Sequence, residues 1–102
     1  MEFQIESRSG RVSVAGDMTV YCAPELKPAL LLEAAAGHNS LELDLSQVQE
    51  FDTAGLQLLL LLSLEMQGRL RIVACSPAVH AVLELTHSGR LLGAHTPGPE
   101  VA

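Results

Sequence analysis

The segment DTAGLQLLLLLSLEM, residues 52–66, limits the possible folds of this chain more than any other part. Its composition predicts a helix, and at about 100° per residue its leucines point all round the helix axis. Such a helix cannot lie on a surface with one apolar stripe against the core and one polar face in water. Its leucines must be buried on most sides or covered by a partner protein, and we favour the partner.

The rest of the chain predicts strands and helices in a definite order. Alternating apolar residues on both sides of a turn at Ser9-Gly10 predict a β-hairpin over residues 3–18. Further strands are expected at 41–46 and 70–75, and helices at 23–37, 55–68 and 77–86. Alternation of strand and helix after the hairpin implies parallel strands joined by crossover helices. The expected fold class is α/β: a single domain with a mixed β-sheet, an N-terminal hairpin and helices packed mainly on one face.

The first predicted helix contains an internal proline. Pro24 suits its first turn and Gly37 can close it. Pro28, however, would remove the backbone hydrogen bond to residue 24. We therefore expect the helix either to begin late, near Lys27, or to kink at Pro28.

Charge and composition exclude several classes of partner. The chain has 102 residues, enough for one domain, and twelve Asp and Glu against six Lys and Arg give a net charge of −6. An acidic protein gains no counterion-release energy on a phosphate backbone, so nucleic acid is not an expected partner. Anionic membrane surfaces are disfavoured for the same reason.

The chain ends and the cysteines indicate a cytoplasmic protein. No apolar segment typical of a signal peptide follows Met1, so Cys22 and Cys75 are expected to be reduced thiols packed as small apolar side chains. The leucine run 58–62 is too short to span a bilayer. Residues 94–102 are rich in proline and glycine and are expected to form a flexible tail after a domain covering residues 1–93.

No pattern in the chain predicts an enzyme, a metal site or a cofactor. The four histidines, His38, His80, His87 and His95, form no metal-ligand spacing, although His80 and His87 could share a face of one continuous helix. The serines include no G-x-S-x-G motif, and the glycines form neither a phosphate-binding loop nor a dinucleotide-binding motif. We expect a protein that acts without catalysis.

The start of the leucine-rich helix is the strongest candidate site. Asp52 or Thr53 can accept hydrogen bonds from the free N–H groups of its first turn, and capping alone would explain either residue. The same free N–H groups and the helix dipole favour negative charge. A phosphate on Thr53 would therefore be stabilised on the protein and would change the local surface sharply.

The segments LELDLSQVQEFDTAGLQLLLLL and GRLRIVACSPAVHAVLELTHSGRLL closely resemble STAS domains, the family of the bacterial anti-sigma-factor antagonists. The resemblance covers about residues 3–93. It implies that Asp52 is the aspartate of the family's D-S-S-G signature, Thr53 the phosphoacceptor and Gly55 the glycine. Ala54 departs from the signature because it lacks the second hydroxyl. The resemblance also makes Leu56 and Gln57, with Asp52, Ala54 and Gly55, candidates for contact with a partner.

The resemblance implies a regulatory function and several kinds of protein partner. The leading expectation is a non-catalytic antagonist that binds a kinase-type anti-sigma factor or another signalling protein, with phosphorylation control at Thr53. The alternative is an accessory subunit of an ABC-type lipid-transport ATPase, because the D-T-x-G form resembles STAS proteins that accompany such ATPases. A homodimer through the leucine-rich helix is a further expectation.

Overall fold

The computed structural model describes residues 3–89, and its elements follow the predicted order. The elements are β1 (Phe3–Arg8), β2 (Arg11–Met18), α1 (Ala23–Ala34), β3 (Leu41–Phe51), α2 (Thr53–Glu65), β4 (Leu70–Cys75) and α3 (Pro77–Leu85). The tail predicted for residues 94–102, and the last residues of the domain predicted for 1–93, lie outside the described residues.

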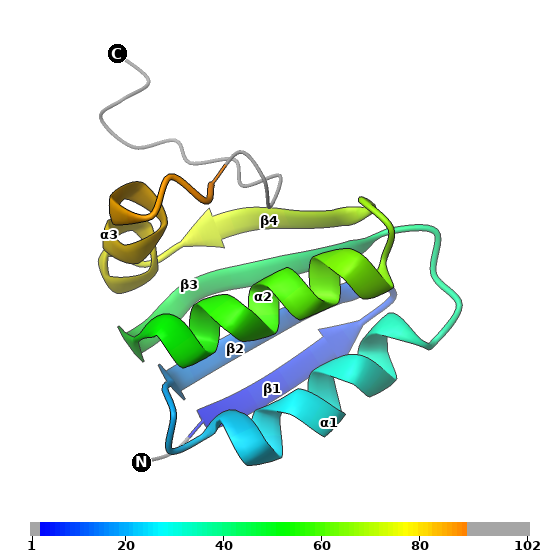
Figure 1. Ribbon diagram of the computed structural model, residues 1–102. Helices are drawn as coiled ribbons and strands as arrows, with labels where there is room; N and C mark the ends of the chain where they lie inside the picture. Colours follow the sequence, from blue (N-terminus) through cyan, green and yellow to red (C-terminus); the bar gives the residue numbers. More distant parts are fainter. Residues whose placement is uncertain (1–2, 90–102) are drawn as a thin grey trace.

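The four strands form one mixed sheet in the order β1-β2-β3-β4 (Figure 1). β1 runs antiparallel to β2, whereas β2, β3 and β4 are parallel. Ser9 and Gly10 connect the hairpin with φ angles of 51° and 85°. Positive φ at both central residues is the geometry of a tight hairpin turn, which glycine adopts without strain. The predicted hairpin and mixed sheet are confirmed.

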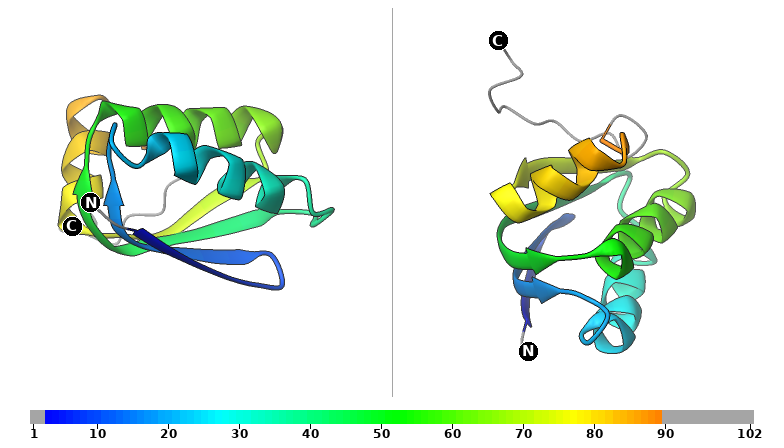
Figure 2. Two further views of the ribbon diagram at one scale, coloured as in Figure 1. Left: turned by 90° about the horizontal axis from the view of Figure 1, so that it is seen from below. Right: turned by 60° about the vertical axis from the view of Figure 1, so that its left-hand side comes forward.

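Helices α1 and α2 lie side by side over one face of the sheet, and α3 stands at the end where β3 and β4 finish (Figure 2). Alternate residues of the strands turn toward α1 and α2 and are almost fully buried. These are Val12 and Val14 of β2, Leu41, Leu43 and Leu45 of β3, and Leu70 and Ile72 of β4. The prediction of helices mainly on one face is confirmed, and the opposite face of the sheet carries no helix within residues 3–89.

Most of the leucine-rich helix is buried within the protein itself. α2 contacts the sheet on one side and both α1 and α3 on others. Its buried side chains are Leu56, Leu58, Leu59 and Leu62. Among the leucines of α2, only Leu64 is largely exposed, at 75%. The sheet, α1 and α3 supply much of this cover, but Leu60 and Leu61 are only half-buried, so a partner on the remaining apolar area stays a prediction. Among residues 3–89, no helix has the length and apolarity needed to cross a membrane.

α1 begins early and contains Pro28, so the late start near Lys27 was wrong. The chain enters the helix because the carbonyl of Thr19 accepts the Ala23 N–H at 2.9 Å. Pro28 removes one hydrogen bond, to the carbonyl of residue 24. Residue 24 is exposed in the first turn, where water can satisfy that carbonyl.

β3 is longer than predicted and continues through the polar segment 46–50 to Phe51. Its last residues pair with the end of β2, where Met18 lies opposite Phe51. Two register shifts between β2 and β3 accommodate the extra length. Because β3 ends level with β2, the residues that follow both strands meet at one edge of the sheet.

Candidate functional site

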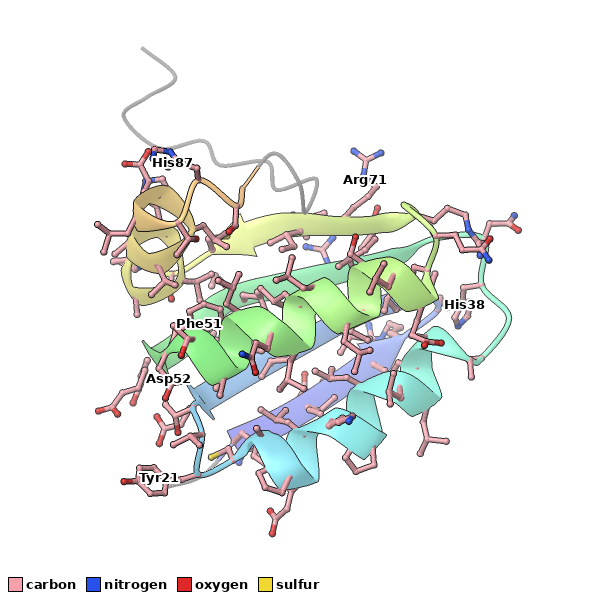
Figure 3. The ribbon with its side chains drawn as sticks, in the orientation of Figure 1. Tyr21, His38, Phe51, Asp52, Arg71 and His87 are labelled. Atoms are coloured by element: carbon pink, nitrogen blue, oxygen red, sulfur yellow. The ribbon has the colours of Figure 1, made fainter. Side chains whose placement is uncertain are left out.

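A single carboxylate, that of Asp52, organises the edge where β2 and β3 end. Its Oδ1 accepts hydrogen bonds from the backbone N–H groups of Ala54 at 2.9 Å and Gly55 at 3.3 Å. Its Oδ2 accepts from the Val20 N–H at 3.1 Å. Asp52 therefore caps α2 and also holds the loop that leads from β2 to α1. Figure 3 shows Asp52 and Tyr21, from that loop, at the same end of the molecule.

Gly55 lets α2 approach the end of β2 closely. A Cβ atom at this position would lie 2.5 Å from the carbonyl oxygen of Met18 and 2.7 Å from Cε1 of Phe51. Real Cβ atoms do not approach other atoms so closely, and a strand carbonyl cannot easily move away. Close packing of α2 against the end of β2 therefore explains the glycine of the D-T-A-G segment without any contact to a partner.

The structure separates the predicted site residues into exposed and buried ones. Thr53, the first residue of α2, is exposed, and so is Gln57 one turn later. The helix start within two residues of Gly55 and the exposure of Thr53 agree with the sequence prediction. Gly55 and Leu56 are buried and support the site from beneath, whereas Asp52 and Ala54 are partly buried.

The loop after β2 contributes two apolar side chains that the sequence analysis did not single out. Val20 is 57% exposed and Tyr21 is 75% exposed. The hydrogen bond from the Val20 N–H to Asp52 places them beside the start of α2. We call Val20, Tyr21, Thr53 and Gln57 the α2 N-terminal surface. The available sequence signal was a pair of large side chains in a loop, where polar residues are more usual.

The carboxylates at the ends of β2 and β3 give this edge a negative character. Asp17 lies opposite Glu50 in the β2–β3 pairing, and Asp52 is the first residue after β3. Within residues 3–89, none of these three carboxylates forms an ion pair with a lysine or arginine. A phosphate on Thr53 would therefore add to the negative charge already present at this edge of the sheet.

The described histidines do not gather into a site. Within residues 3–89, no group of three or more His, Cys, Asp or Glu side chains is arranged to hold a metal ion. α3 ends at Leu85, so His87 lies beyond it and does not share a helix face with His80. His95 lies outside the described residues.

Replacing Asp52 should separate its two roles. Asp52→Ala removes all three accepted hydrogen bonds and should lower the free energy of unfolding by about 1–2 kcal/mol. Asp52→Asn retains an oxygen for Ala54 and Gly55 but turns an amide group toward the Val20 N–H, so only the loop contact is lost. Urea unfolding should rank the variants wild type, asparagine, alanine. The Val20 amide should lose hydrogen-exchange protection in both variants, and retained protection would show that the loop is held by other contacts.

The half-buried Cys75 should be a poor nucleophile at neutral pH. Burial raises the pKa of its thiol to about 11, and the negative charge of Asp44 adds to this shift. Because the thiolate is the reactive form, the alkylation rate should rise with pH and reach half of its maximum only near pH 11. Iodoacetamide labelling at a series of pH values, with peptide mass spectrometry to separate Cys75 from the buried Cys22, measures this dependence. A midpoint near pH 9 would contradict it.

Comparison with known proteins gives a consistent set of relatives. The family model described as "Mlab, STAS domain" matches residues 1–93. An anti-sigma factor antagonist from Mycobacterium paratuberculosis superposes with a TM-score of 0.79 at 25% identity, over 97% of this chain and 87% of that chain. The unphosphorylated anti-sigma factor antagonist SpoIIAA has the same fold, with a TM-score of 0.69 at 18% identity, over 97% and 90% of the two chains. No curated protein matches the sequence.

Proposed function

This chain belongs to the STAS domain family, and from that premise we propose that it is a non-catalytic regulatory module of the cytoplasm that acts as an anti-sigma-factor antagonist. Its partner would be a kinase-type anti-sigma factor or a related signalling protein. Phosphorylation of Thr53 would control whether the partner is bound. The structural neighbour at 25% identity is an anti-sigma factor antagonist, which supports an antagonist-like role.

The observation that carries the proposal is the exposed hydroxyl-bearing residue at the first position of α2. A kinase can reach a side chain there without unfolding the domain. The carboxylate of Asp52 already occupies the N–H groups of Ala54 and Gly55, so a phosphate would project outward rather than fold onto the helix. The added charge would then face whatever protein covers the α2 N-terminal surface.

The apolar part of the same surface supports binding of a protein. Val20 and Tyr21 present exposed apolar area beside Thr53. A tyrosine that is largely exposed in the free protein is a common anchor at protein interfaces. A dianion introduced next to such an anchor must be desolvated in the complex, and its burial without a partner charge costs several kcal/mol, on the order of 3–5. Phosphorylation would therefore release the partner.

The proposal is tested by mapping phosphorylation and binding together. The chain is incubated with extract of its own cells and ATP, and mass spectrometry locates any phosphate. We expect phosphate on Thr53, none on the Thr53→Ala variant, and capture of a kinase-type anti-sigma factor by the unphosphorylated chain only. Phosphate elsewhere, or capture that is equal for both forms, would contradict control at Thr53.

A second candidate is an accessory subunit of an ABC-type lipid-transport ATPase. The D-T-x-G form of residues 52–55 and the description of the matching family favour it. In that case the captured protein would be a transporter ATPase, and a lipid-transport operon would surround the gene. Pairing of two copies through α2 is a separate prediction, which would use the exposed Leu64.

A further inference from the structure

Four charged residues form one row across the sheet face that carries no helix. Arg8 of β1 lies opposite Arg11 of β2, Arg11 lies opposite Glu42 of β3, and Glu42 lies opposite Arg71 of β4. The neighbouring residues along β2, β3 and β4 are buried against the helices. Because side chains alternate along a strand, the four charged residues point to the opposite face. We call Arg8, Arg11, Glu42 and Arg71 the cationic row.

The positive charge of the cationic row is only partly neutralised within the protein. Arg11 lies 3.9 Å from Glu42 and 3.8 Å from Asp44, both near the upper limit for an ion pair. Arg8 and Arg71 form no ion pair within residues 3–89. Two arginines directly opposite each other, as Arg8 and Arg11 are, repel. Three of the six lysines and arginines of an acidic chain therefore stand together, and the two carboxylates that form ion pairs with them, Glu42 in the row and Asp44 beside it, both contact Arg11.

A row of opposite charge borders the cationic row on the same face. Glu6 lies opposite Ser13, and Ser13 lies opposite Asp44, one step further along the sheet. The hydroxyl of Ser46 donates a 2.6 Å hydrogen bond to Asp44, which lowers the pKa of that carboxyl and keeps it charged. A hollow of about 560 Å³, lined by Glu6, Ser7, Arg8, Arg11 and Ser13, lies where the two rows adjoin.

We propose that the cationic row binds an acidic polypeptide segment of a protein partner. Arg8 and Arg71 stand three strand spacings apart, roughly 14 Å, so the row is long and only one residue wide. That shape fits a single chain segment. A membrane or a nucleic acid presents a broad anionic surface, which would also meet Glu6, Asp44 and the net charge of −6. The adjoining acidic row would fix the position of the segment on the sheet, because Glu6 and Asp44 would repel its carboxylates if it shifted from the cationic row onto the acidic row.

This site is separate from Thr53, since the strand neighbours of the cationic row are buried against the helices and the row itself points to the other face of the sheet. The domain would then have two surfaces for protein partners: one at the α2 N-terminus that phosphorylation can change, and one on the sheet that it does not reach. Arg71 extends past β4, clear of the helices, as Figure 3 shows. One partner could therefore remain bound to the sheet while a second partner binds to or leaves the α2 N-terminal surface.

The test uses the full chain and a fluorescein-labelled deca-glutamate peptide, with binding measured by fluorescence anisotropy. The double variant Arg8→Gln/Arg71→Gln should bind roughly tenfold more weakly than wild type, because two surface ion pairs are lost. Lys27→Gln is the control, since it removes an exposed positive charge on α1, and it should change affinity by less than about twofold. Added salt should weaken wild-type binding more than binding by the double variant.

Four results would overturn the proposal. The first is a loss of binding free energy in Lys27→Gln that is at least half the loss in the double variant, which would mean that only net charge matters, because Lys27→Gln removes one positive charge and the double variant removes two. The second is an absence of peptide binding together with arginine-dependent binding to phosphatidylglycerol vesicles, which would assign the row to a lipid surface. The third is sedimentation showing a wild-type dimer that the double variant abolishes, which would make a second copy the occupant. The fourth is loss of peptide binding in Thr53→Ala, which would place the peptide at α2. Thermal melts verify that each variant folds.

Discussion

Gly55→Ala should destabilise the domain by about 2 kcal/mol or more, although alanine is the better helix former. At an ordinary helical position the added methyl group would stabilise by about 1 kcal/mol. At position 55 it would lie 2.5 Å from the carbonyl oxygen of Met18 and 2.7 Å from Phe51. Relief requires α2 to move away from the end of β2, which loosens the packing beneath the site. Urea unfolding of both proteins measures the difference.

Gln57→Ala is the matched control for this prediction. It places alanine two residues further along the same helix, at an exposed position where no neighbouring atom needs to move. Its free energy of unfolding should stay within about 0.5 kcal/mol of wild type. If Gly55→Ala were as stable as wild type, α2 could shift without penalty, and the glycine would be dispensable for the fold.

The elements that the sequence predicted correctly are those in which local pattern and tertiary packing agree. The start of β3 could be predicted, because Leu41, Leu43 and Leu45 alternate with polar residues and are fully buried. The end of β3 could not be predicted, because segment 46–50 is mostly polar and shows no alternation of apolar and polar residues. It is a strand because its backbone pairs with the end of β2, which is a non-local cause.

The candidate site shows the same division between local and distant causes. Asp52 as a helix cap follows from its position before an apolar run, and the two hydrogen bonds of Oδ1 lie within three residues. The hydrogen bond of Oδ2 to Val20 spans 32 residues, so no local pattern could predict it. The cover of α2 likewise depends on where α1 and α3 pack. A helix that is apolar all round indicates burial without telling which part of the protein buries it.

Thr53→Glu should weaken partner binding at least tenfold, about 1.4 kcal/mol, while leaving the domain folded. A negative side chain at a helix N-terminus is tolerated or mildly favourable, by about 0.3–1 kcal/mol. In a complex the same charge would be desolvated beside Val20 and Tyr21, with no lysine or arginine paired to the local carboxylates within residues 3–89. Titration against the partner captured by the wild-type chain, with thermal melts in parallel, separates binding from stability.

Two further variants decide what the hydroxyl of Thr53 does. Gln4→Glu adds the same charge at an exposed position of β1, and it should leave binding unchanged if the effect belongs to the α2 N-terminal surface. Thr53→Ala should bind normally but lose regulation by phosphorylation. If the glutamate variant binds as tightly as wild type while the alanine variant fails, the hydroxyl is a contact rather than a switch. The accessory-subunit function is then favoured, because a constitutive subunit needs a contact and no switch. If both variants bind normally, Thr53 only begins the helix, and the interface lies elsewhere on α2 or on the sheet.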